Sequence, residues 1–90
     1  GYGSDIDKAM EIINDLLNKD SRVLAEPERK VAVAELADSS VNIIVRPWAK
    51  AEDYWGVFFD FQKNCKEAFD AAGIEIPFPQ TVVHMNKLEA

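Results

Sequence analysis

The chain is poor in the side chains on which most metal and redox sites depend. Its 90 residues include one cysteine, Cys65, and one histidine, His84. A lone cysteine rules out an internal disulfide and leaves no second thiolate for a zinc site, and it fits a reducing compartment. We therefore expect no metal and no cofactor.

Long apolar runs and clusters of positive charge are also missing from the sequence. No run approaches the roughly 20 apolar residues of a membrane-spanning helix, and the start does not resemble a cationic signal segment. Sixteen acidic and ten basic residues give a net charge of -6, and the longest basic cluster is Arg29-Lys30. Nucleic acid and direct membrane contact are therefore disfavoured, and we expect this piece of chain to be soluble.

What is present indicates one small folded domain. Apolar residues make up 48% and charged residues 29%, which is ordinary for a globular chain. The chain starts with Gly1-Tyr2-Gly3 rather than methionine. We interpret it as a piece of a longer product.

Two amphipathic helices are predicted from apolar residues at helical spacing. The first runs from Asp5 to about Lys19, with Ser4 as its N-cap. The second runs from Glu52 to Ala72 and ends at Gly73, a left-handed C-terminal cap. The apolar stripe of the first helix is Ile6, Ala9, Met10, Ile13, Leu16 and Leu17, and that of the second is Trp55, Phe58, Phe61, Cys65, Ala68, Phe69 and Ala72.

A β-hairpin is predicted between the helices. Val31 to Ala37 and Val41 to Trp48 are rich in β-forming residues and are separated by the polar turn Asp38-Ser39-Ser40. Pro47 lacks a backbone donor and should lie near the end of its strand. The core-facing residues of the second strand are expected to be Val41, Ile43 and Val45.

The C-terminal part is stiffened by proline. Pro77, Phe78 and Pro79 form a rigid step that should direct a short strand, Thr81 to Met85, away from the domain. An unpaired strand of this kind needs a partner. We expect an α/β domain over residues 1–76, and a linker with a C-terminal strand over residues 77–90.

The order of elements favours an α+β fold, a ferredoxin-like (split βαβ) two-layer sandwich. That layout needs one more strand before the first helix, and the stub Gly1 to Gly3 is the only candidate. The first strand is then largely missing. Its lane in the sheet would be filled by Thr81 to Met85 folding back, by a neighbour's strand, or by direct closure of the gap.

No catalytic constellation stands out. The Gly1 to Ser4 stretch lacks the further glycine and the lysine of a phosphate loop. His84 has no evident partner, and Cys65 is most simply a buried filler. Carboxylates such as Asp53, Asp60 and Asp70 are spread around helices, and none pairs obviously with another carboxylate on an apolar wall that would raise its pKa. We expect a protein that is not an enzyme.

Aromatic residues are dense around the start of the second predicted helix. Helical spacing assigns most of them to the core, and some should face another subunit or domain. The set is Trp48, Tyr54, Trp55, Phe58, Phe59 and Phe61.

Three segments resemble the cytoplasmic C-terminal region of the small-conductance mechanosensitive (MscS-like) channel family. They read GYGSDIDKAMEII, ELADSSVNIIVRPW and DYWGVFFDFQKNCKEAFDAAGIEIPFPQ. The resemblance implies an oligomeric ion-transport protein that releases osmotic pressure. This chain would form the wall of a cytoplasmic vestibule built from seven subunits on the inner side of the cell membrane, where it would filter solutes.

The same resemblance implies a role for the C-terminal segment. In the family, the strand after the proline step joins copies of itself in a small parallel barrel. The implied subunit-interface residues are Pro77, Phe78, Pro79, Thr81, Val82, Val83, His84 and Met85. The alternative is a free-standing ferredoxin-like module that binds a ligand or a protein through its open sheet.

Overall fold

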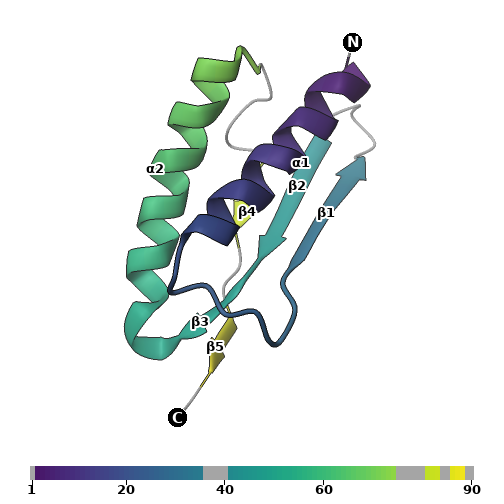
Figure 1. The fold of residues 1–90 in the computed structure, drawn as a ribbon. Coiled ribbons are helices and arrows are strands. Elements are labelled where there is room, and N and C mark those ends of the chain that lie inside the picture. Colours follow the sequence, from purple (N-terminus) through teal and green to yellow (C-terminus); the bar gives the residue numbers. More distant parts are fainter. Residues whose placement is uncertain (1, 36–40, 75–80, 84–85, 89–90) are drawn as a thin grey trace.

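A computed structural model describes residues 2–35, 41–74, 81–83 and 86–88 of the chain. The described residues form two helices and five short strands, which are arranged as in Figure 1. In chain order the elements are α1 (Tyr2–Lys19), β1 (Lys30–Glu35), β2 (Val41–Arg46), β3 (Trp48–Lys50), the 3-10 turn Ala51–Asp53, α2 (Tyr54–Ala72), β4 (Thr81–Val83) and β5 (Asn86–Leu88).

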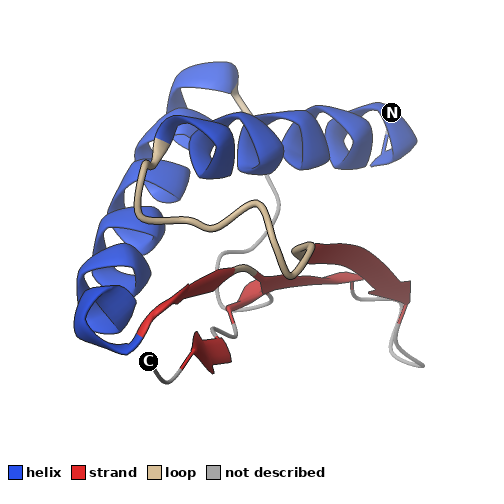
Figure 2. Ribbon diagram, turned by 60° about the horizontal axis from the view of Figure 1, so that its bottom comes forward, coloured by secondary structure: helices blue, strands red, loops and turns tan. Residues whose placement is uncertain are grey.

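The architecture is α+β in two layers, as the sequence predicts. Both helices lie on the same side of the strands, as the turned view shows (Figure 2). The larger sheet has the order β1-β2-β4, and β3 pairs with β5 in a second, two-stranded sheet. The main core therefore lies between the helices and the larger sheet.

The predicted hairpin is confirmed. β1 and β2 pair antiparallel over six residue pairs, including Val31 with Val45 and Val33 with Ile43. Along β2 the burial alternates, and Val41, Ile43 and Val45 face the core. Pro47 separates β2 from β3, because a residue without an N–H cannot continue the ladder.

Helix α1 begins earlier than predicted. It includes Tyr2, so Gly3 and Ser4 lie inside the helix. The expected strand stub and the Ser4 N-cap are both wrong. Among the described strands none pairs with this end of the chain, whereas a helix forms hydrogen bonds between its own backbone groups. Ala9, Ile13 and Leu17 are buried, with Ile6, Met10, Ile12 and Leu16 packed partly buried around them.

Helix α2 buries a stripe that begins at Val57. Its buried residues are Val57, Phe61, Cys65 and Phe69, each four positions after the last. The prediction of Trp55 in this stripe is wrong, because two helical residues turn the side chain about 200° away from Val57. Ala72 is exposed and Ala68 is only half-buried. Phe58, a predicted core residue, is half-buried against a small second cluster of Ala49 and Val57.

The C-terminal cap of α2 is confirmed. Gly73 has φ 69°, in the left-handed region. Its N–H donates to the carbonyl oxygen of Asp70 at 3.2 Å, and the N–H of Ile74 donates to that of Phe69 at 3.0 Å. Glycine adopts this conformation without the steric cost that a Cβ would bring.

The C-terminal strands fold back onto the same chain. β4 lies parallel to β2, with Thr81, Val82 and Val83 opposite Ile43, Ile44 and Val45. β5 lies parallel to β3. No described strand lies between β2 and β4, so folding back closes the sheet in this single chain.

Candidate functional site

The predicted assembly segment is described only in part. Thr81, Val82 and Val83 form β4, whereas Pro77, Phe78, Pro79, His84 and Met85 lie outside the described residues. β4 is the last strand of its sheet and pairs with β2 over three residues only. Detaching such a short edge strand costs little free energy, and the freed strand can then pair with another strand.

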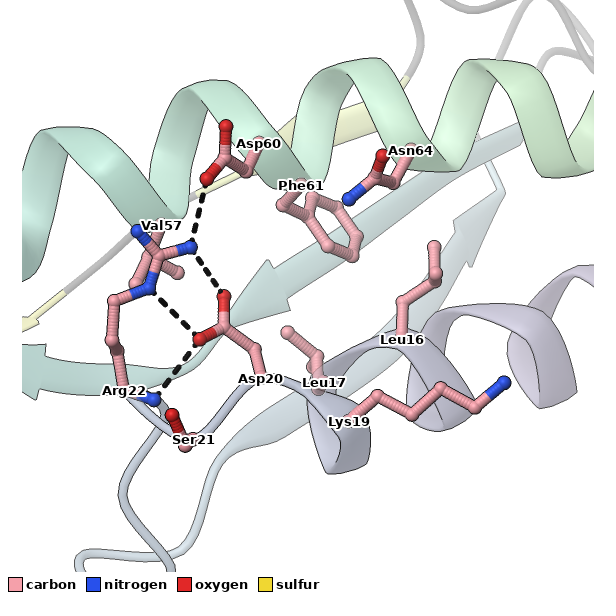
Figure 3. Close-up of a pocket in the computed structure, with 10 residues that line it drawn as sticks. All are labelled: Leu16, Leu17, Lys19, Asp20, Ser21, Arg22, Val57, Asp60, Phe61 and Asn64. Carbon is pink, nitrogen blue, oxygen red and sulfur yellow. Dashed lines mark hydrogen bonds and ion pairs between the residues drawn. The ribbon is translucent and has the colours of Figure 1, made fainter.

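A pocket of about 370 Å³ lies between the end of α1 and the first half of α2 (Figure 3). Its floor is apolar, and its rim carries two carboxylates and two cations. The lining residues are Leu16, Leu17, Lys19, Asp20, Ser21, Arg22, Val57, Asp60, Phe61 and Asn64.

Arg22 dominates the rim of this pocket. Its Nε donates to Oδ1 of Asp20 and its Nη2 to Oδ2 of Asp20, both at 2.9 Å. The backbone N–H of Arg22 also donates to Oδ1 of Asp20, at 3.0 Å. Nη2 reaches Oδ2 of Asp60 on α2 at 2.9 Å (Figure 3). Arg22 therefore joins the loop after α1 to α2.

The electrostatics of the rim follow from these contacts. The hydrogen bonds from Arg22 hold the pKa of the Asp20 carboxyl below its usual value, against a smaller opposing effect of burial. The two carboxylates raise the pKa of Arg22. Lys19 pairs with Asp15 at 2.8 Å. Because both cations are already engaged, the pocket offers little to an incoming anion.

Gly56 makes the close approach of Arg22 possible. A Cβ at this position would lie 2.7 Å from Nη1 of Arg22. The absent side chain therefore leaves room for the guanidinium to lie across α2. This contact joins residues 34 positions apart, and nothing in the local sequence signals it.

The other predicted site residues gather into no reactive group. Cys65 is fully buried in the core, and burial raises the pKa of its thiol to about 12. Within the described part of the chain, no three histidine, cysteine or acidic residues lie close enough to hold a metal ion. Asp60 pairs with Arg22 rather than with another carboxylate.

Two aromatic rings lie exposed on α2. Trp55 is 58% and Phe59 63% exposed, and their rings stack with centroids 5.7 Å apart at 25°. Phe58 meets both rings edge-on, at 5.7 and 5.4 Å. The exposure of Trp55 and Phe59 leaves them available to another subunit or domain, and the expectation that some aromatics face one stays a prediction.

The described residues form a small α+β domain whose helix α2 displays the exposed rings of Trp55 and Phe59. Its family is more specific. Residues 1–76 match the family model for the C-terminal domain of the mechanosensitive ion channel MscS. The chain belongs to this family.

Curated relatives agree with the family match. The chain is 40% identical over 84 residues to a small-conductance mechanosensitive channel of Edwardsiella ictaluri, covering 93% of this chain and 29% of that protein. It is 42% identical over 90 residues to an uncharacterized MscS family protein of Archaeoglobus fulgidus, covering 99% of this chain and 32% of that protein. A small-conductance mechanosensitive channel of Helicobacter pylori is 34% identical over 79 residues, with 87% and 29% covered.

The chain thus spans about three-tenths of the length of these relatives. In its described residues, neither helix has the length and hydropathy needed to cross a bilayer.

Proposed function

We propose that this chain forms part of the wall of the cytoplasmic vestibule of a mechanosensitive channel, on the inner side of the cell membrane. The channel would be a heptamer that releases solutes when osmotic pressure stretches the membrane. The observation that carries the proposal is the match of residues 1–76 to the MscS C-terminal domain. The relatives support it, because this chain covers only 29% of the Edwardsiella ictaluri channel, and pore-forming segments would belong to the rest of a longer chain.

The C-terminal segment would assemble the subunits. In the channel, Thr81 to Met85 would leave β2 and pair with the same segment of neighbouring subunits, guided by the step from Pro77 to Pro79. β4 is suited to such an exchange because it holds its own sheet by three residue pairs. An edge that pairs with a symmetry mate leaves no unpaired strand behind.

The ferredoxin-like arrangement is part of the same proposal. β2 and β4 are parallel and adjacent in this chain. In a ferredoxin-like sheet, two such strands flank a third that precedes the first helix. A strand supplied by the upstream part of the longer chain would take the place beside β2 once β4 moves away.

A ring of these domains would carry a strong field. Each chain contributes a net charge of -6, and an acidic wall concentrates cations inside the vestibule. Reversing Asp15 and Glu11, both exposed on α1, to lysine in the full-length channel should shift the reversal potential in asymmetric salt. An unchanged potential would remove the filter role and leave the structural one.

The decisive experiment uses the full-length channel in bacterial cells that lack mechanosensitive channels. We expect the intact gene to rescue survival of a sudden drop in osmolarity, and removal of residues 77–90 to abolish both rescue and oligomer formation. A protein that stays monomeric and gives no tension-activated current would favour the free-standing binding module instead.

A further inference from the structure

The exposed aromatic pair on α2 has an acidic border. Trp55 and Phe59 are one helical turn apart and share the face of α2 opposite Val57. Beside them, Glu52 is exposed and Asp53 half-buried in the 3-10 turn that precedes α2. Within the described chain, neither carboxylate makes an ion pair. We call these four residues the aromatic surface.

A second surface lies on the side of the sheet that the helices leave uncovered. Lys30 and Arg46 are directly opposite each other in the register of β1 and β2, and both are exposed. Ala32 and Ile44 form the next pair on that face, each half-buried. We call these four residues the sheet surface.

The sheet surface places the positive charges of Lys30 and Arg46 next to each other. Like charges opposite each other on neighbouring strands are destabilising. Among the described residues, no acidic side chain pairs with Lys30 or Arg46. A carboxylate from outside the described chain would relieve this repulsion.

We propose that the aromatic surface of one copy docks on the sheet surface of the next copy around the channel. Glu52 and Asp53 would meet Lys30 and Arg46, and the guanidinium of Arg46 would lie against the ring of Trp55, an arrangement that arginine favours. This inference rests on the proposed ring of subunits.

The geometry selects this contact over a two-fold pairing. α2 and β1 lie at opposite sides of the domain (Figure 1). Both helices cover one side of the sheet (Figure 2), and the burial alternation along β2 puts the sheet surface on the other side. Two different patches on opposite sides produce a head-to-tail contact, which generates a ring when the rotation between successive copies closes. Two aromatic surfaces facing each other would instead oppose their acidic borders.

Cross-linking in the full-length channel tests the contact. Phe59→Cys combined with Ile44→Cys should give a ladder of multimers with a short bis-maleimide on a denaturing gel. Phe59→Cys combined with Lys8→Cys is the matched control, because Lys8 is exposed on α1, outside both surfaces. The wild-type channel is the blank, since Cys65 is buried.

Charge exchange supplies the second arm. Arg46→Glu in the double-cysteine background should lower the multimer yield at least fivefold, and adding Glu52→Lys should restore most of it. A strong loss without restoration, or products only of monomer mass, would overturn the contact.

Light scattering of the wild-type channel separates the two proposals. If the channel is oligomeric and the Phe59/Ile44 pair gives no more product than the Phe59/Lys8 control, this contact is wrong and the proposed function stands. A monomeric wild-type channel would overturn both.

Discussion

Arg22 joins the loop after α1 to α2 through Asp20 and Asp60, and we expect these two carboxylates to contribute unequally to the free energy of unfolding. Asp20 accepts three hydrogen bonds from Arg22, and its side chain is only 20% exposed. Hydrogen bonds to charged groups are worth about 1.5–3 kcal/mol. Asp60 accepts one, and its side chain is 58% exposed, where an ion pair contributes about 0.2–1 kcal/mol.

We therefore expect Asp20→Ala to lower the free energy of unfolding by about 2 kcal/mol and Asp60→Ala by about 0.5 kcal/mol. For a domain of this size, these losses correspond to falls in Tm of about 12 °C and about 3 °C. Urea denaturation of the 90-residue chain at pH 7, followed by circular dichroism, measures the two losses in free energy of unfolding. The control is Asp15→Ala, which removes an exposed pair with Lys19 worth about 0.3 kcal/mol.

A loss in free energy of unfolding for Asp60→Ala as large as that for Asp20→Ala would contradict this expectation. That result would mean that the contact across to α2, rather than the bidentate contact within the loop, supplies the stability. Equal and negligible losses at both positions would instead show that solvent competes successfully for Arg22.

Four further outcomes follow from the surroundings of individual residues. Folding lowers the pKa of Asp20, so the stability that its carboxylate contributes is complete above the unfolded pKa near 3.9 and is lost as pH falls through the folded pKa. Asp20→Asn should therefore reduce the loss of unfolding free energy at acid pH. An unchanged pH dependence would contradict this. Cys65, with its pKa raised to about 12, should react with a thiol reagent at pH 8 only after urea unfolds the chain; rapid labelling of the native chain would be contrary. Gly73→Ala should cost about 1 kcal/mol in urea denaturation, because φ is 69° and a Cβ meets no atom within 4 Å. Gly56→Ala should stabilise more in an Arg22→Ala background than in the wild type, by at least about 0.5 kcal/mol; equal effects would exclude the clash with Nη1.

Local patterns predicted those parts of the fold that depend on local chemistry. The hairpin follows from alternation of Val41, Ile43 and Val45, and the end of α2 follows from Gly73, because strand period and left-handed caps leave direct signs in the sequence. Pro47 likewise marked the end of β2. These features need only a few neighbouring residues to be specified.

The errors arose where the outcome depends on distant partners. Whether Trp55 or Val57 heads the buried stripe of α2 is decided by the rotation of the helix on the sheet. Tyr2 and Gly3 belong to α1 rather than to a strand, and no strand among the described residues pairs with them. The contact of Arg22 with Asp60 spans 38 positions, and no local pattern in the sequence marks it.

The sequence shows an excess of aromatic residues but does not show which of them form an exposed surface. Aromatic density near Tyr54 to Phe61 indicated that some rings face outward, but not which. The structure selects Trp55 and Phe59 and adds the cross-strand pair of Lys30 and Arg46, which required knowledge of the register. Register connects strands across a turn and is therefore invisible to a local pattern.

The central claim is that the C-terminal strand leaves its own sheet to join neighbouring subunits in the channel, and disulfide trapping at Val82 tests it most directly. In full-length channels in native membranes, Val82→Cys alone should oxidise to disulfide-linked subunits. Adding Ile44→Cys, the position opposite Val82 in the single chain, should change little. A disulfide between positions 44 and 82 of one chain, with no linked subunits, would contradict the account.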